Sequence, residues 1–200
     1  MTPPDTVAAP ASSVWSVPNL LTLSRLPLSV LLFACIEFQA WVAALATFAV
    51  AAVTDSVDGW WARRFNQTSV FGRVFDPLTD KVLIGGAFIF LIAVPDSRMR
   101  PWMAAAVIGR ELLVTGIRGY VESLGKKFGA DWFGKLKTVL QSAWLLAVLA
   151  YLSAVNLDWP ADRTAVLEGV HLGLLYAMLA ATVGSGLQYA WKAVRILRTD

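Results

Sequence analysis

Six long apolar stretches alternate with short polar segments along the chain. Each has about the 20 residues that an α-helix needs to cross the hydrocarbon core of a bilayer, although some reach this length only by including polar positions at one end. The pattern therefore predicts an all-α integral membrane protein with six transmembrane helices. We expect these helices over residues 20–38, 41–61, 76–94, 102–121, 136–155 and 164–196.

Local signals mark the ends of several helices. The third is expected to begin at Asp76 and Pro77, because Asp caps free N–H groups and Pro is tolerated at the first helical position. Glycines and charges over residues 122–135 indicate a loop between the fourth and fifth helices. Residues 1–14 are rich in Pro and Ala, with no Lys or Arg, so we expect a disordered tail followed by one domain over residues 15–198.

The composition agrees with a bilayer environment. Apolar residues make up 57% of the chain and charged residues only 16%, whereas a soluble domain is about one quarter charged. Most Lys and Arg residues fall on one side of the expected helices, and Arg98, Arg100 and Arg163 are all that the other side holds. The positive-inside rule then places the basic side, with both chain ends, in the cytoplasm. The net charge of +3 is small, and we expect no nucleic-acid partner.

Four aspartates occur where apolar helices meet a short basic segment. Asp55 and Asp58 are three residues apart, and Asp76 and Asp80 are four apart, so each pair shares a helix face. Two short-linked antiparallel helices can point these faces at each other. The four carboxylates would repel unless one or two divalent cations bound between them, and we expect two. Oxygen ligands alone favour Mg²⁺ or Mn²⁺ over zinc.

The residues around the aspartates indicate phosphoryl transfer. Gly59 and Ala62 leave room for a bulky group, Arg63 can pair with a phosphate, and Ser69 can donate to phosphate or ribose. The ensemble predicts a metal-assisted phosphoryl-transfer site at the membrane surface. The simpler alternative is a set of helix-end carboxylates paired with neighbouring arginines. We favour it less, because all four carboxylates, the glycines and Arg63 occur together at these spacings.

The pattern D-x-x-D-G-x-x-A-R-x8-G-x-x-x-D-x-x-x-D resembles the signature of the CDP-alcohol phosphotransferase family, with every fixed position present. The resemblance implies six transmembrane helices, metal ligation by Asp55, Asp58 and Asp76, and a double role for Asp80 as metal ligand and catalytic base. It implies that an alcohol attacks the β-phosphate of a CDP-linked lipid and releases CMP. The residues that it assigns to the CDP moiety or its entrance are Asn19, Thr22, Arg25, Gly59, Ala62, Arg63, Ser69 and Gly72.

Three further blocks, residues 17–25, 109–118 and 133–141, resemble the bacterial branch whose acceptor is sn-glycerol 3-phosphate and whose lipid donor is CDP-diacylglycerol. That branch implies a multi-pass protein of the bacterial inner membrane. A dianionic acceptor needs a basic pocket, and Arg110 and Arg118 lie two turns apart on one expected helix. Lys135 and Lys137 begin the next. Alternatively, these residues are only positive-inside signals whose side chains reach the headgroups.

Other functions stay open. The nearest is the branch of the same family whose acceptor is phosphatidylglycerol. A divalent-cation carrier would use the carboxylates for transport but leaves Gly59, Arg63 and Gly72 unexplained, and an inactive scaffold is a third alternative. Gly169 and Gly173 have the GxxxG spacing that allows helices to pack closely, which is weak support for a homodimer.

Overall fold

The computed structural model describes residues 17–64, 70–124 and 132–197. This part of the chain is entirely helical, without strands, which confirms the expected all-α class and the number of helices. The elements are α1 (Val17–Glu37), α2 (Trp41–Arg64), α3 (Val70–Leu91), the 3-10 turn η1 (Pro95–Ser97), α4 (Pro101–Ser123), α5 (Trp132–Asn156) and α6 (Ala161–Leu197).

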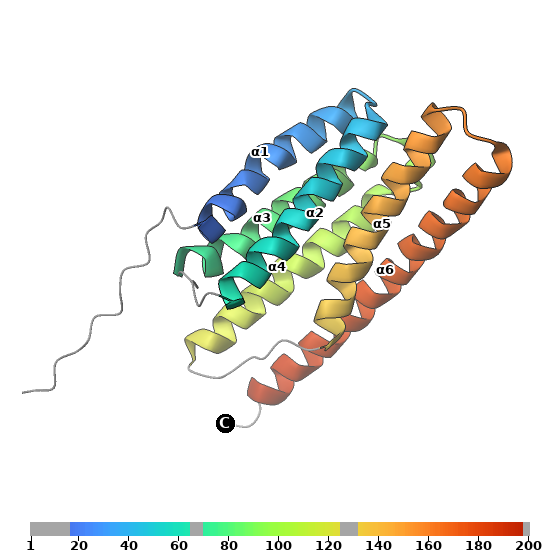
Figure 1. Ribbon diagram of the computed structural model, residues 1–200. Coiled ribbons are helices and arrows are strands. Elements are labelled where there is room, and N and C mark those ends of the chain that lie inside the picture. Colours follow the sequence, from blue (N-terminus) through green and yellow to red (C-terminus); the bar gives the residue numbers. More distant parts are fainter. Residues whose placement is uncertain (1–16, 65–69, 125–131, 198–200) are drawn as a thin grey trace, which may run out of the picture.

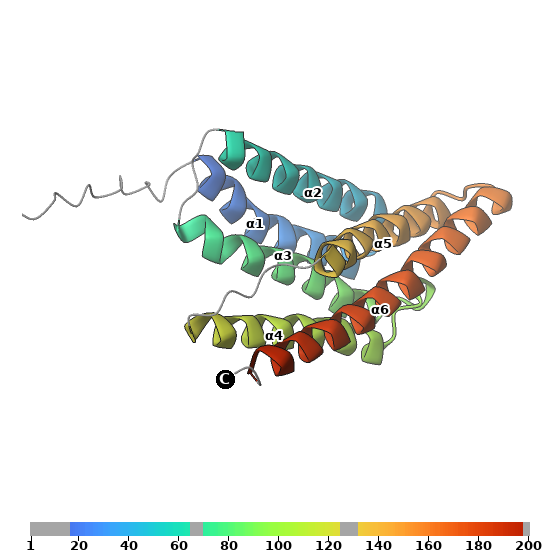
Figure 2. The same ribbon diagram turned by 90° about the horizontal axis from the view of Figure 1, so that it is seen from below.

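The helices run alternately up and down as an elongated bundle (Figure 1). α1 packs against both α2 and α3 and lies between them, as Figure 2 shows. α5 packs against α6 and α2, and α6 also packs against α4. The alternation places the end of α2, the start of α3, the end of α4 and the start of α5 at one end of the bundle (Figure 1). Segments far apart in sequence can therefore build one site there.

The expected start of the third helix at Asp76 is wrong. α3 begins at Val70, so Asp76 and Pro77 lie inside it. Residues 70, 71, 74 and 75 are all Val or Phe, so the helical spacing of apolar residues continues on the N-terminal side of the proline. The expected loop over 122–135 is likewise shorter, because α4 continues to Ser123 and α5 begins at Trp132. Lys135 thus lies in the first turn of α5.

The bundle has an apolar interior and apolar outer faces. Trp144, Phe48 and Phe88 are fully buried, whereas Leu113 and Leu187 expose more than two thirds of their surface. Two segments, Leu136–Asn156 in α5 and Ala161–Lys192 in α6, are long and apolar enough to cross a membrane. Such faces are suited to contact with lipid tails and indicate membrane association. The arrangement as six spans stays a prediction.

The GxxxG residues of α6 do not mediate packing within the chain. A Cβ added at Gly169 or Gly173 would meet no atom of the described residues within 4 Å. The small residues therefore leave an open strip on α6, and the homodimer stays a prediction.

Gly86 allows α3 to approach α1 closely. A Cβ built at this position would lie 2.2 Å from Cζ of Phe33, whose ring stacks on Phe90 at a centroid distance of 5.1 Å. We expect Gly86→Ala to destabilise the bundle by about 1–3 kcal/mol, because the ring must move or the helices must separate. Thermal unfolding of the detergent-solubilised protein measures the effect.

The neighbouring glycine provides a matched control. A Cβ at Gly85 would lie 3.6 Å from Cγ1 of Ile108, an ordinary contact, so Gly85→Ala should leave the unfolding midpoint unchanged or raise it. Adding Phe33→Leu to Gly86→Ala should recover part of the loss. Equal midpoints for the two alanine variants would contradict the close approach.

Candidate active site

Arg25 joins the first and last aspartates of the acidic pattern. Its Nη1 lies 2.6 Å from Oδ1 of Asp55 on α2 and 2.7 Å from Oδ1 of Asp80 on α3. The side chain of Arg25 is only 1% exposed, whereas those of Asp55 and Asp80 are 50% and 38% exposed. A buried guanidinium from α1 thus holds two carboxylates from different helices at one point.

This arrangement corrects one detail of the sequence prediction. α2 and α3 were expected to face each other directly, but α1 inserts between them (Figure 2). The carboxylates converge nonetheless, because α1 contributes a cation rather than an apolar side chain at this level. Asp58 lies one turn from Asp55 on α2, and Asp76 one turn from Asp80 on α3, although their side chains are outside the described set.

The described residues fit a cation at this point. Asp55 and Asp80 already share one positively charged nitrogen, and their oxygens are ligands that Mg²⁺ and Mn²⁺ prefer. Among the described side chains, no group of three or more acidic, His or Cys residues is placed to hold a metal. A complete ligand set would need Asp58 and Asp76 as well.

Asp80 also lines a cavity of about 710 Å³ enclosed by α3, α4, α5 and the end of α6. The deeper wall is apolar and includes Phe88, Val107 and Ile108. Six charged side chains line the same cavity, four cations and two carboxylates, so its charge is positive. They are Asp80, Lys81, Arg110, Glu111, Arg118 and Lys137.

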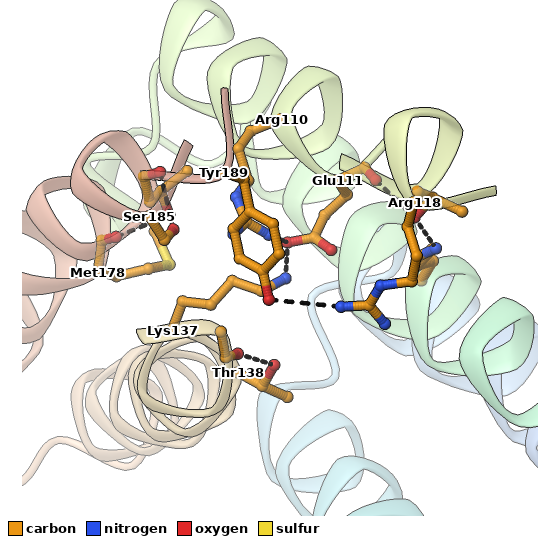
Figure 3. A network of polar contacts seen from close by, with 12 residues as sticks. Arg110, Glu111, Arg118, Lys137, Thr138, Met178, Ser185 and Tyr189 are labelled. Carbon is orange, nitrogen blue, oxygen red and sulfur yellow. Dashed lines mark hydrogen bonds and ion pairs between the residues drawn. The ribbon is translucent and has the colours of Figure 1, made fainter. Parts of the chain in front are cut away.

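A polar network connects these charges across three helices (Figure 3). The carboxylate of Glu111 accepts hydrogen bonds from Lys137 of α5 and from Nη1 of Arg110 at 3.4 Å. Between α3 and α4, Nζ of Lys81 donates a hydrogen bond to Oγ1 of Thr115 at 2.6 Å. Arg110 and Lys137 are both buried, and a buried charge needs a partner. Glu111 supplies that partner and fixes both cations in the cavity wall.

Several buried donors around the cavity have no partner in the described part of the chain. They are Nε and Nη2 of Arg110, Nε of Arg118 and Nε2 of Gln141. All four belong to residues that line the cavity, and all four are N–H groups. A buried donor without a partner is costly. The cavity therefore suits a ligand rich in acceptor oxygens, and a phosphate group carries such oxygens and the matching negative charge.

Tyr189 of α6 completes the basic wall. Its ring centroid lies 5.2 Å from Cζ of Arg110 and 6.0 Å from Cζ of Arg118, and its hydroxyl accepts a hydrogen bond from Nη2 of Arg118 at 3.4 Å. Figure 3 shows the ring close to Arg110, with the hydroxyl pointing toward Arg118. No local feature of the sequence indicates this role, because Tyr189 lies in an apolar helix outside every motif.

The structure describes the surroundings of only some of the predicted site residues. Arg110, Arg118 and Lys137 line the cavity together with Asp80, as an acceptor pocket beside the acidic site requires. Thr22 is buried in α1, three residues before Arg25. Ser69 lies outside the described residues. Six further predicted site residues lie on helices, but the structure does not describe what surrounds them: Asn19, Gly59, Ala62, Arg63, Gly72 and Lys135.

Comparison with known proteins gives consistent matches. A sequence profile described as CDP-alcohol phosphatidyltransferase matches residues 15–185. Three curated relatives carry the name CDP-diacylglycerol–glycerol-3-phosphate 3-phosphatidyltransferase. Those of Pectobacterium atrosepticum and Shigella flexneri serotype 5b are 33% and 35% identical over 180 residues, and that of Escherichia coli K12 is 36% identical over 183 residues. Each match covers 88% of this chain and 93% of the relative.

Proposed function

Because the chain belongs to the CDP-alcohol phosphatidyltransferase family, we propose that it transfers a phosphatidyl group from CDP-diacylglycerol to sn-glycerol 3-phosphate. The products are phosphatidylglycerophosphate and CMP, and the reaction belongs to phospholipid biosynthesis. The curated relatives are named for this reaction, and none of those reported above is named for transfer to phosphatidylglycerol.

The observation that carries the proposal is the cavity beside Asp80. Its cations exceed its carboxylates, and the N–H groups that lack a partner among the described residues come from Arg110, Arg118 and Gln141. A phosphate dianion satisfies both the charge and the free donors. The hydroxyl of an acceptor held there by its phosphate would lie on the same side of the bundle as Asp80. This agrees with a small phosphorylated alcohol as acceptor.

The proposed site holds two divalent ions, Mg²⁺ or Mn²⁺. Their ligands are Asp55, Asp58, Asp76 and Asp80. The ions, when bound, neutralise the pyrophosphate and the departing CMP. Gly59, Ala62 and Gly72 leave room for the nucleotide, while Arg63 and Ser69 bind its phosphates and ribose. Asn19 and Thr22 of α1 line the entrance of the proposed nucleotide site.

The proposed reaction is a single displacement. Asp80 accepts the proton from the 1-hydroxyl of glycerol 3-phosphate, and the oxygen attacks the β-phosphorus in line. The new bond joins that oxygen to phosphorus, and the bond between the β-phosphorus and the bridging oxygen breaks, so that CMP leaves. Arg25 keeps Asp80 oriented through the contact between Nη1 and Oδ1. Because the acyl chains stay in the bilayer, only the headgroup needs to reach the polar end of the bundle.

The acceptor pocket is formed by residues of three helices. Arg110, Arg118 and Lys137, with Lys135 at the start of α5, bind the phosphate of glycerol 3-phosphate. Lys81 lies next to Asp80 in sequence and lines the same cavity, so it belongs with this group although the sequence did not single it out. Glu111 limits the positive charge and contacts both Arg110 and Lys137 through Oε1.

We place the six helices across the inner membrane of a bacterium, with the acidic end of the bundle toward the cytoplasm. The Lys and Arg distribution favours this orientation. It gives the site access to water-soluble glycerol 3-phosphate and to the headgroup of the lipid donor. Attaching a reporter enzyme to each end of the chain in separate fusions would test the orientation.

The decisive assay incubates membranes containing the protein with labelled glycerol 3-phosphate and CDP-diacylglycerol. We expect label to enter the lipid fraction only when a divalent cation is present, with release of one CMP per lipid formed. Membranes from cells without the expressed chain provide the background. Incorporation that requires phosphatidylglycerol as acceptor would instead assign the chain to that branch, and no incorporation with either acceptor would contradict the transferase function.

A further inference from the structure

Tyr189 contacts both arginines of the acceptor pocket from a different helix. It is 1% exposed, lies on α6 and faces α4, which carries Arg110 and Arg118. Both guanidinium groups lie within the distance at which a cation is attracted to an aromatic face. The phenolic oxygen adds a hydrogen bond to Arg118. One side chain therefore contacts two cations that are eight residues apart.

α4 alone does not fix the spacing of these arginines. Eight residues of α-helix separate their Cα atoms by about 12 Å along the axis, so both long side chains must bend toward each other to share one phosphate group. The two guanidinium groups also repel each other, most strongly where water is scarce. A group placed against both can hold them inward and offset part of the repulsion. Tyr189 has the position, the aromatic face and the hydroxyl to do both.

Gly134 of α5 holds the hydroxyl of Tyr189 on the other side. A Cβ at position 134 would lie 3.0 Å from that oxygen, so the hydroxyl fills the space that the glycine leaves. The phenol thus lies between α4 and α5, the two helices that carry the cations of the pocket. Its position is set by packing and does not depend on a ligand.

We propose that Tyr189 is a positioning residue that sets the spacing of Arg110 and Arg118 for the phosphate of the acceptor. It thereby contributes to the preference for a phosphorylated alcohol. The inference rests on the proposed function of the same cavity. Tyr189 does not touch the reacting atoms, so its loss should affect acceptor binding and leave binding of the lipid donor unchanged.

Steady-state kinetics of Tyr189→Leu and Tyr189→Phe test this role. Leu removes the ring and the hydroxyl, and we expect the KM for glycerol 3-phosphate to rise about tenfold. Phe keeps the ring, so the rise should be about threefold. The KM for CDP-diacylglycerol should stay within about twofold for both variants. Inorganic phosphate, used as a competitive inhibitor, should weaken in parallel with the KM for glycerol 3-phosphate.

Two more variants keep the test specific. Tyr176→Leu alters an exposed tyrosine of the same helix and should leave both KM values unchanged. Gly134→Ala pushes on the hydroxyl without removing any cation, and should raise the KM for glycerol 3-phosphate alone. The phenylalanine variant, nearly identical in volume, keeps the test informative if the leucine variant does not fold.

Two results would overturn the inference. One is an unchanged KM for glycerol 3-phosphate in Tyr189→Leu, and the other is an equal rise of both KM values, as expected of a purely structural residue. Failure of the wild-type protein to use glycerol 3-phosphate would overturn the proposed function together with the inference. A normal wild type beside an unchanged Tyr189→Leu would overturn the inference alone.

Discussion

Replacing Asp80 by asparagine is expected to reduce turnover by about 10²- to 10⁴-fold, the usual contribution of a positioned general base. Asparagine has the same shape and can still accept a hydrogen bond from Arg25, so the contact between α1 and α3 should survive. The substitution removes the negative charge and the ability to take up a proton, while the other three aspartates of the proposed site remain to hold the cations. Binding of CDP-diacylglycerol should therefore remain largely intact.

The measurement pairs the incorporation assay with equilibrium binding of labelled CDP-diacylglycerol to the purified protein. Asp96→Asn is the matched control, because Asp96 is an exposed aspartate in η1, which connects α3 and α4 at the other end of the bundle from Asp80 (Figure 1). It should change neither quantity. Near-normal turnover of Asp80→Asn would exclude Asp80 as the base. Loss of donor binding together with turnover would show that the role of Asp80 in holding the metal and donor dominates over its role as the base.

Replacing Arg25 by methionine is expected to give the largest loss of stability among the polar residues. The substitution removes the one cation that the structure shows between the described carboxylates of Asp55 and Asp80. Breaking a buried pair typically costs about 3–5 kcal/mol. The two carboxylates are partly exposed, so we expect about 3 kcal/mol, the lower end of that range. Thermal unfolding in detergent, in the presence of a chelator, measures it.

A divalent cation should rescue this variant more than the wild type. Mg²⁺ can take the place of the missing guanidinium between the same carboxylates, so the unfolding midpoint of Arg25→Met should rise more on its addition. Arg25→Lys keeps the charge but loses the planar fork, and should fall between the two proteins. No response of Arg25→Met to Mg²⁺ or Mn²⁺ would contradict a cation site at Asp55 and Asp80.

The convergence of Asp55 and Asp80 was predictable from spacing, whereas the metal site stays a prediction. Intervals of three and four residues place each aspartate pair on one face of a helix, and the structure brings Asp55 and Asp80 to one nitrogen. The role of Arg25 was not predictable. The resemblance assigns Arg25 to the nucleotide or its entrance, and nothing local in the sequence shows that α1 inserts between α2 and α3, where Arg25 contacts two aspartates. That arrangement depends on how whole helices pack. Gly86 allows α1 and α3 to approach closely, but this role can be recognised only once the fold is known.

The basic residues of the cavity were predictable in part, but for a different reason. Arg110, Arg118 and Lys137 are unusual as charges in apolar helices, so they stood out. Tyr189 and Gln141 did not stand out, because tyrosine and glutamine are unremarkable within such helices. Their roles arise from contacts between α4, α5 and α6, which no short motif encodes. The early start of α3 was not predicted, because Pro77 indicates the first turn of a helix, which is the usual helical position of proline.

The length of α6 has a consequence for the lipid around the protein. Its 37 residues extend about 55 Å, against a hydrocarbon core of about 30 Å. Where α6 crosses the bilayer as proposed, a helix this long would lean or project into water, and the lean would adjust to bilayer thickness. Tyr189 lies near the C-terminal end of α6, so its depth would change with that tilt. In the proposed orientation, hydrophobic mismatch would therefore act on the contacts of Tyr189 with Arg110 and Arg118.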